Sequence, residues 1–565
     1  MNEGYTDSKY YPNQYEWSDM SLPEERIDAI PAETSQIVRK AFPQGHKYLQ
    51  MRDVLGTIYT DDVFADLYPS DGQPAIRPWR LALVTVMQFS EELTDRQAAE
   101  AVRDRLTWKY GLSLSLTDTG FDHSVLCEFR QRLLNHDAAQ RLLNVFLSHL
   151  SAKGWLKARG KQRTDSTHIL SAVRRLNQLE LVHETLRYAL NELAIAAPDW
   201  LRNRVNPNWF EAYSQRTSNY LLPKKASDRQ AWASQVGADG YYLLRHIYDN
   251  NCLPHLKDLM ALQILRMVWI QHFYENDGEV CLRGKRDQPP PSQLITSPYD
   301  LDARCSTKRD TTWIGYKVHL TETCDDDLPL LITNVETRSA TEPDHDATPI
   351  IHKHLVENGY VPHEHFVDRG YMSIDHVVSG QQTHIDLMGS VLDDNSWQAR
   401  LNGYDSKTFT IDWQQQQATC PQGNISCSWS LACTPSQRPV VKIKFRHKDC
   451  VACEALDLCT KNREKRRTLT ILAPQSLFEA QQQARERQET DAFKEACHVR
   501  AGVEGAISQL AHALNGRRSR YRGHRKTHLQ HLAMATAMNL SRVLNWFHDV
   551  PRHKTPTSQF ARLAA

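Results

Sequence analysis

Three acidic residues occur in short motifs of the kind that hold metal ions. Asp368 ends an apolar run in HFVDRGYMS, Asp165 lies within RTDSTHIL, and Glu504 lies within RAGVEG. An aspartate at a strand end projects its carboxylate from a rigid edge, and Gly370 leaves room for a close approach. An aspartate that caps the following helix would fit the same fragment. Asp368 therefore needs partners before it indicates a metal site.

Carboxylates from three separate elements are what a pair of divalent ions needs. In in-line phosphoryl displacement, bridging and terminal carboxylates hold two ions roughly 3.5–4 Å apart. Magnesium takes few protein carboxylates and leaves its other positions to water and phosphate oxygens. The sequence predicts Asp165 on a short strand, Asp368 at the end of a later strand and Glu504 within a helix. Phosphoryl transfer is the chemistry that such a set supports.

A cysteine-rich block suggests a second kind of metal site. Cys450 and Cys453 form a C-x-x-C pair, and Cys459 follows six residues after Cys453. A tetrahedral zinc site takes four thiolates or imidazoles, and a C-x-x-C turn supplies two of them. We select Cys420, in the turn CPQG, as the fourth ligand of a structural Zn²⁺. Reduced, buried thiols are the alternative, and the competing ligands are Cys427, Cys433 and His447.

Basic residues gather in clusters although the net charge of the chain is only +1. The segment GRRSRYRGHRK, residues 516–526, carries six Arg or Lys and no acid, and the segments 157–163 and 461–467 are also basic. Such clusters can neutralise phosphates locally even when acids elsewhere balance the total charge. A solvated charged face is the alternative for each cluster.

Length and composition place the chain among ordinary globular proteins. Its 565 residues allow about three or four domains, and 41% hydrophobic with 24% charged residues is typical of a globular protein. No window has the apolar length of a membrane span, and the opening residues are too polar for a signal peptide. Twelve cysteines without a secretory signal argue against a disulfide framework. We expect a cytoplasmic protein with no membrane partner.

The expected secondary structure changes in character along the chain. Helical apolar spacing begins near residue 46, with a capping-box pattern from Thr94 to Gln97. A helical stretch from about 171 to 285 ends at three consecutive prolines. The alternating segments 311–323 and 327–337 predict an antiparallel pair across an acidic turn.

Beyond this pair, strands and helices alternate, which is typical of a mixed α/β sheet. After the cysteine block we expect one long helix over about 476–514, followed by the Arg-rich turn and a last helix. His168 lies three residues after Asp165, so on a strand it lies on the opposite face and is expected to be structural.

Together these motifs resemble a known family. TDSTH, VDRGY and RAGVEG, followed by the Arg-rich turn and HLAMATAMNLSRVLNWF, resemble the catalytic segments of DDE transposases of bacterial insertion sequences. PWRLALVTVMQFSEELTDRQAAEAV and FDHSVLCEFRQRL resemble the helical N-terminal domain of one branch, which also has a long insertion and a cysteine-rich block. The resemblance covers about residues 45–548.

The resemblance implies a mixed α/β fold: a ribonuclease-H-like catalytic core, a helical N-terminal domain, a helical insertion and a small cysteine-rich, zinc-type insertion. The expected parts are a polar arm over 1–45, a helical DNA-binding domain over 46–155, the core over 156–170, 296–394 and 476–548, the helical insertion over 171–295, the cysteine-rich insertion over 395–475, and a tail over 549–565.

It also implies a transposase in which Asp165, Asp368 and Glu504 hold two Mg²⁺ or Mn²⁺ ions. One ion would activate water or a DNA 3′-hydroxyl, and the other would stabilise the leaving oxygen. The expected partners are double-stranded DNA, both element terminal inverted repeats and target, and a second copy of the chain in a homodimer on DNA. A bacterial, nucleoid-associated location follows. The expected DNA contacts are Arg369, Tyr371, Arg500, Arg517, Arg518, Arg520, Arg522 and Lys526.

Some of these residues have alternative roles. Arg500 precedes Glu504 by four residues, so in a helix it could orient that carboxylate, contact a phosphate or form an ordinary surface pair. Tyr371 could stack on a displaced base or pack beneath the strand end.

The family's fuller signature has a tyrosine three positions before the arginine and a lysine seven after the glutamate, where this chain has Cys497 and Ala511. Two other functions therefore stay open: a metal-dependent DNA nuclease without strand transfer, and a catalytically inactive DNA-binding relic.

Overall fold

The computed structural model describes residues 22, 29–71, 74–218, 220, 222–249, 252–550 and 563. The chain divides into two compact units, Met1–Ala152 with Leu532–Ala565, and Lys153–His531. The final stretch 532–548, expected within the catalytic core, thus groups with the N-terminal helices. Most of the expected tail 549–565 and most of the first 28 residues of the expected arm lie outside the described residues.

The first unit is helical. Its central helix α3 buries eleven residues of thirteen, from Pro78 to Phe89, as a helix that is apolar on nearly all sides must. The predicted capping box at the start of α4 is confirmed. The Thr94 side chain accepts a hydrogen bond from the Gln97 amide, and the Gln97 side chain accepts one from the Thr94 amide. Helix α1 lies within the segment expected as a polar arm. The helices are α1 (Ala32–Ala41), α2 (Lys47–Gln50), α3 (Pro78–Ser90), α4 (Asp95–Asp104), α5 (Leu106–Gly111), α6 (Ser124–Asn135) and α7 (Arg141–Ala152).

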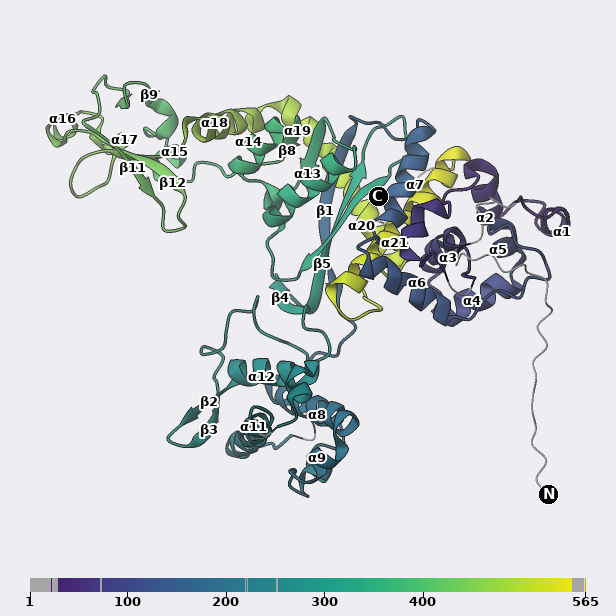
Figure 1. Cartoon of the computed structure of the whole chain (residues 1–565). Helices are drawn as coiled ribbons and strands as arrows, with labels where there is room; N and C mark the ends of the chain where they lie inside the picture. The colour runs from purple at the N-terminus through teal and green to yellow at the C-terminus, as the bar shows by residue number, and fades with distance from the viewer. Residues whose placement is uncertain are drawn as a thin grey trace, which may run out of the picture. The chain divides into compact units, whose positions relative to one another are not determined.

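A six-stranded mixed sheet organises the second unit (Figure 1). Its order is β4-β5-β1-β7-β8, with β6 also paired to β5; β1 runs antiparallel to β5 and parallel to β7. The predicted antiparallel pair is confirmed as β5 and β6. Helices α13 (Thr348–Glu357) and α14 (Ile374–Gln382) alternate with the later strands. The strands are β1 (Lys161–Leu170), β4 (Arg304–Lys308), β5 (Thr311–Thr323), β6 (Ile332–Ser339), β7 (Glu364–Val367) and β8 (Asp386–Met388).

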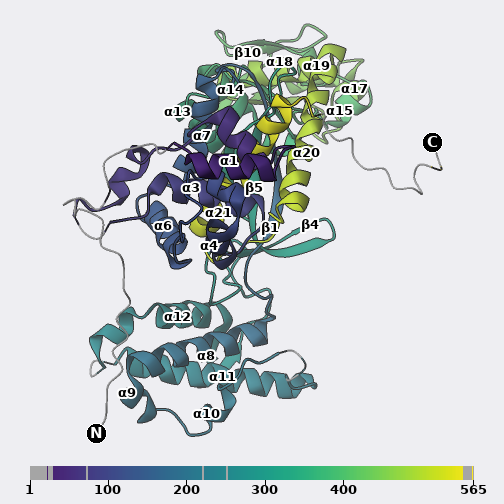
Figure 2. The ribbon, with the colours of Figure 1, turned by 90° about the vertical axis from the view of Figure 1, so that its right-hand side faces the viewer.

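The helical insertion has its own hydrophobic core, and α8, α11 and α12 pack together in it (Figure 2). Gly240 lies against the Trp269 ring, where a side chain would clash. The insertion ends in a β-hairpin, β2 and β3, where we expected helix as far as residue 285; Asp277 and Gly278, both with positive φ, form its turn. Its elements are α8 (Gln178–Ala196), α9 (Pro198–Arg202), α10 (Trp209–Ala212), α11 (Ala226–Ile247), α12 (Met260–His272), β2 (Phe273–Asn276) and β3 (Glu279–Leu282).

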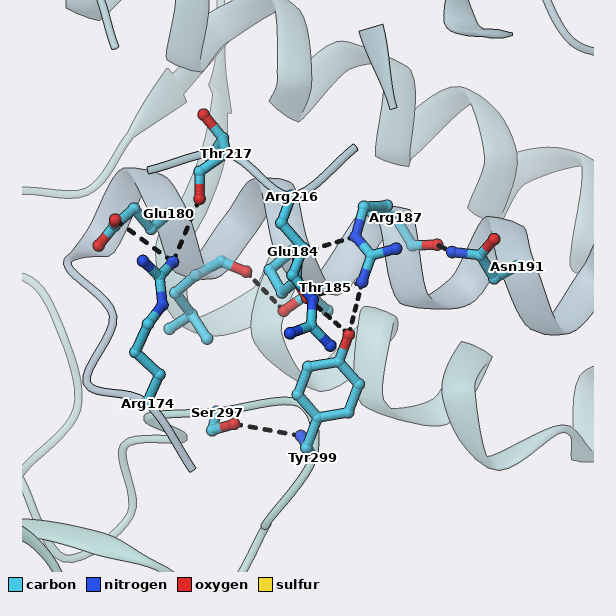
Figure 3. Close-up of polar contacts among 11 residues, drawn as sticks. Arg174, Glu180, Glu184, Thr185, Arg187, Asn191, Arg216, Thr217, Ser297 and Tyr299 are labelled. Carbon is cyan, nitrogen blue, oxygen red and sulfur yellow. Dashed lines mark hydrogen bonds and ion pairs between the residues drawn. The ribbon is translucent and has the colours of Figure 1, made fainter. Parts of the chain in front are cut away.

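A buried carboxylate ties α8 to the chain that returns to the sheet. Glu184 accepts hydrogen bonds from Arg187 (2.8 Å) and from the Tyr299 hydroxyl (2.6 Å), and Arg216 lies 3.4 Å away (Figure 3). Burial alone would raise the pKa of Glu184, but these donors lower it below its usual value. These charge-assisted interactions hold α8 against the segment of Tyr299, which leads back to the sheet.

The cysteine-rich insertion also packs around apolar residues of its own. Strands β11, β12 and β13 form an antiparallel sheet whose inner face buries Val441, Ile443, Leu469 and Ile471. The insertion can form this core because strands β12 and β13 alternate apolar and polar residues. The elements are α15 (Trp397–Arg400), β9 (Thr410–Asp412), β10 (Gln417–Thr419), β11 (Ser428–Cys433), β12 (Pro439–Lys444), α16 (His447–Val451), α17 (Leu456–Cys459) and β13 (Thr468–Leu472).

The helix expected over 476–514 is broken into shorter pieces. The Thr490 side chain accepts a hydrogen bond from the Phe493 amide (3.3 Å), so it ends one helix and caps the next. The pieces are α18 (Gln475–Glu489), α19 (Asp491–Cys497), a 3₁₀ turn (His498–Gly502), α20 (Val503–Ser508) and a π-helical turn (Gln509–Ala513), and the last helix is α21 (His524–Phe547). No helix in the part of the chain that the structure describes is long and apolar enough to cross a bilayer.

Candidate functional site

Asp165 and Asp368 come from neighbouring parallel strands at the same level. The register of β1 and β7 pairs Thr164 with Val367, so Asp165 and Asp368 are the next residues on each strand. Neighbouring strands lie about 4.8 Å apart, and residues at equal register in parallel strands face the same side. The two predicted carboxylates are therefore brought together, and the strand positions predicted for both are confirmed.

The segment that carries Glu504 crosses the same face of the sheet. Side chains alternate along β1, so Arg163, Asp165 and Thr167 share a face. Arg163 donates to the Val499 carbonyl (2.6 Å), and Arg517 donates to the Thr167 hydroxyl (3.2 Å). Residues 499–517 are thus held to β1 at Arg163 and at Thr167, which are the neighbours of Asp165 on this face of the strand.

Apolar packing holds the start of this segment in place. Phe366 of β7 and Phe493 of α19 belong to one buried cluster, against which Cys497 and Val499 pack. Cys497, where the family signature has a tyrosine, is therefore part of the packing between α19 and the sheet.

Arg500 pairs with Asp165 and not, as the four-residue spacing suggested, with Glu504. Its guanidinium lies 3.6 Å from an Asp165 carboxylate oxygen. Residues 498–502 form a 3₁₀ turn, in which positions four apart do not share a face as they do in an α-helix. The structure thus assigns Arg500 to the first acid.

Asp165 is electrostatically coupled to its neighbours. Burial raises the pKa of Asp165 above its usual value, and the Asp368 carboxylate adds to the rise. The Ser166 amide donates to one Asp165 oxygen (2.7 Å), and this bond, with Arg500 and Lys308, opposes the shift. A cation bound nearby would therefore stabilise the charged form of the Asp165 carboxylate.

Glu504 is exposed on α20, and Asp368 is exposed at its strand end, where its own side chain accepts from the Gly370 amide (3.1 Å). Asp368 therefore makes the capping contact that we considered as an alternative, while also lying beside Asp165. Among the described residues, no three His, Cys, Asp or Glu side chains converge tightly enough to hold a metal ion. Asp165 and Asp368 lie side by side and the segment of Glu504 crosses the face of Asp165, but the described residues form no closed ligand set.

A fourth carboxylate, which the sequence did not single out, contacts β1 at the residue next to Asp165. Asp344 accepts from the Ser166 hydroxyl (3.4 Å) and pairs with Lys317 (3.1 Å), and Lys308 lies 3.9 Å away. It precedes α13 in a stretch with no recognisable motif, so only the long-range contacts reveal it. Through its hydrogen bond with Ser166, Asp344 holds in place the side chain of the residue that follows Asp165.

Tyr371 does not reach solvent. Its side chain is 1% exposed, and its hydroxyl lies 2.7 Å from His319 Nδ1. The buried ring cannot stack on a base in this structure, so the packing alternative holds. Arg369, two residues earlier, is exposed.

The Arg-rich turn runs beside the end of β1. The amide of Leu170 donates to the Arg517 carbonyl (2.8 Å), and the amide of Ser519 donates to the Leu170 carbonyl (2.8 Å). The turn's other expected DNA contacts, Arg518, Arg520, Arg522 and Lys526, are exposed. The Arg522 guanidinium lies over the Tyr299 ring, 4.9 Å from its centre. The basic cluster is therefore fixed to the strand of Asp165.

The four cysteines chosen from the sequence line one small cavity. Cys420, Cys450, Cys453 and Cys459 surround it together with Tyr404 and Phe445. Burial raises the pKa of Cys459 to about 11, and the other three sulfurs add to the rise. Cys427 and Cys433, which competed for the site, are exposed and do not line the cavity. Thiols that raise one another's pKa are stabilised as thiolates by a cation between them.

Two family models match this chain. The transposase DDE domain matches residues 419–544, and the transposase domain DUF772 matches residues 36–132. Glu504 and the four cysteines lie within the first match, whereas Asp165 and Asp368 lie outside both. No curated protein and no solved structure matches the chain.

The two matches agree with the resemblance noted in the sequence at both ends of the chain. One covers the N-terminal helices, and the other runs from the cysteine block through Glu504 into the last helix. Together the two matches support a DDE transposase of an insertion sequence.

Proposed function

We propose that this protein cuts DNA at the ends of its own element and joins them to target DNA in a reaction that depends on Mg²⁺. The observation that carries the proposal is the placement of Asp165 beside Asp368 on parallel strands, with the segment of Glu504 held across the same face. This proposal takes the mixed sheet as a ribonuclease-H-like core and the three acids as the catalytic triad.

The donor types at the site suit the expected ions. A DDE domain implies dependence on a divalent metal, and carboxylate oxygens are the ligands that Mg²⁺ and Mn²⁺ prefer. Asp165, Asp368 and Glu504 would hold the ions, which stabilise the charge that develops on the attacking and leaving oxygens. Arg500 and the Ser166 amide hold the Asp165 carboxylate in position before any ion binds.

Double-stranded DNA is the proposed partner. Arg369 beside the second acid and Arg518, Arg520 and Lys526 in the Arg-rich turn are exposed cations close to the strands that carry the acids. Cations so placed can neutralise the phosphates on either side of a scissile bond. We assign recognition of the element's ends to the N-terminal helices, because a helix can enter the major groove, and we propose a homodimer on paired ends.

The test is cleavage and joining of a labelled duplex that bears the element's own ends. Wild-type protein with Mg²⁺ should release the ends and join them to a second duplex, and Asp368→Ala should do neither while binding DNA with unchanged affinity. Asp368 is exposed, so its replacement should leave the fold intact. Cleavage retained by the variant refutes the site. Cleavage without joining in the wild type favours the nuclease, and binding without cleavage in either Mg²⁺ or Mn²⁺ favours the relic.

We propose a structural Zn²⁺ at the cysteine cavity, in keeping with its four sulfur ligands. The sulfurs do not converge tightly enough in this structure to form a finished site, so the proposal rests on the kind and number of ligands. Protein purified without added zinc should contain about one equivalent by mass spectrometry. Cys453→Ser should lose the metal, whereas Cys433→Ser, at an exposed cysteine outside the cavity, should keep it. Well under one equivalent in the wild type would leave the cysteines as buried thiols.

A further inference from the structure

Two rows on the outer face of the β11–β12–β13 sheet carry cations and hydroxyls but no acid, whereas the third row, Ala432, Val440 and Leu472, is apolar. Strand pairing aligns Ser428, Lys444 and Thr468 in one row and Ser430, Lys442 and Thr470 in the next. These rows lie opposite the apolar side chains of the inner face, because residues alternate along a strand. Ser430, Lys442 and Thr470 are exposed, and the other three are half-buried. We call these six residues, with Arg446, the basic sheet face.

The charge on this face is not balanced from within the protein. Among the residues that the structure describes, Lys442, Lys444 and Arg446 form no ion pair with an acid. Asp449, the acid nearest in sequence, lines the cysteine cavity, and Glu464 pairs with Arg466 (2.7 Å). A cluster of unneutralised cations beside hydroxyl donors is complementary to an anion surface.

The spacing of the cations fits a repeated anion. Lys442, Lys444 and Arg446 follow one another at every second position, which places them about 6.6 Å apart along an extended chain. They span about 13 Å, a length of duplex that carries about eight phosphate charges. Each of the three cations therefore has phosphates within reach.

The kind of side chain on the face favours duplex DNA over a single strand. Single-strand binding uses aromatic rings on which bases stack. Trp429 lies between Ser428 and Ser430 in β11, so its ring lies on the inner face, where it packs against the core. The basic sheet face has no ring, and lysine and hydroxyl groups bind phosphate and sugar without reading sequence.

We infer that the basic sheet face of the cysteine-rich insertion is a second DNA-contact surface, which binds the backbone of a duplex without sequence preference. The inference rests on the proposed function in taking duplex DNA as the substrate. It assigns to the insertion a task separate from end recognition and from the acids: to hold flanking or target DNA of arbitrary sequence.

The salt dependence of DNA binding tests this assignment. Full-length protein and a random-sequence 30-base-pair duplex are mixed in EDTA, and Kd is measured by fluorescence anisotropy between 50 and 200 mM NaCl. Each neutralised phosphate contributes about 0.9 to the slope of log K against log salt. Lys442→Gln with Lys444→Gln should therefore lower the slope by about 1.8. Thr470→Glu, which keeps both lysines, should weaken binding at low salt through repulsion.

The matched control removes the same charge elsewhere. Lys407→Gln with Lys494→Gln replaces two exposed lysines that are paired with Asp405 and Asp491, and it should leave the slope unchanged. An unchanged slope in the Lys442/Lys444 variant, or an equal fall in the control, overturns the inference. Equal weakening of polyglutamate binding by the Lys442/Lys444 variant would also overturn it, because the face would then bind anions of any kind. No cleavage occurs in EDTA, so failure of the transposase proposal would appear only in the Mg²⁺ assay.

Discussion

Replacing Asp165 by asparagine is expected to lower the rate of DNA cleavage by about 10³-fold or more, because the loss of a metal-bound carboxylate removes several kcal/mol of transition-state stabilisation. Asparagine has nearly the same shape and can still accept the hydrogen bond from the Ser166 amide. The variant should therefore fold and bind duplex DNA with unchanged affinity. Single-turnover cleavage of the element's ends measures the first effect, and an equilibrium binding assay measures the second.

The pH dependence of the wild type provides an internal check on the same residue. The pKa of Asp165 is raised by burial and by Asp368, so protonation on acidification begins at a higher pH than for an ordinary aspartate. Only the carboxylate form binds Mg²⁺, so the Mg²⁺ concentration for half-maximal cleavage should rise as pH falls through that raised pKa. Cleavage by Asp165→Asn within tenfold of the wild type would remove Asp165 from the site.

Replacing Arg163 by methionine is expected to destabilise the second unit by about 3–5 kcal/mol, the usual cost of removing one partner of a buried ion pair. Arg163 lies 2.7 Å from Glu322, and their side chains are 8% and 1% exposed. The variant would remove this ion pair while Glu322 stays buried. The melting temperature of this unit should fall by on the order of 10 °C, which differential scanning calorimetry measures.

A double variant separates stability from positioning. Replacing Arg163 by methionine and Glu322 by leucine removes both charges, and it should recover most of the lost stability because apolar pairs often substitute well for buried ion pairs. Cleavage should stay low, since the Val499 carbonyl still lacks the Arg163 hydrogen bond that holds the Glu504 segment to β1. A stable double variant that cleaves like the wild type would show that Arg163 has no positioning role.

Short-range sequence patterns predicted several strands of the sheet. The strand of Asp165, the strand that ends at Asp368 and the β5–β6 pair follow from alternation of side chains and from turn residues, which act over a few positions. The capping box at Thr94 is equally local. The four cysteines chosen from their spacing line one cavity for a similar reason, because the C-x-x-C turn already fixes two of them.

Segmentation of the C-terminal helices could not be predicted from periodicity. The sequence 476–514 keeps helical apolar spacing throughout, yet it breaks at Thr490 and again at the 3₁₀ turn before Glu504. At the second break, Arg163 from a strand more than three hundred residues earlier takes the Val499 carbonyl. No local pattern contains that contact, and none indicated the pairing of Arg500 with Asp165.

The candidate site residues can be identified before the fold is known: three acids on separate elements, four clustered cysteines and an Arg-rich turn. Residue type and short-range spacing are sufficient for that, because motifs and secondary structure arise from near neighbours. Their placement follows from the tertiary fold. It brought Asp165 beside Asp368, buried Tyr371, placed Asp344 against Ser166 and left the basic sheet face without acids. Those outcomes depend on contacts between distant segments, whose energies come from burial and pairing that no single stretch of sequence contains.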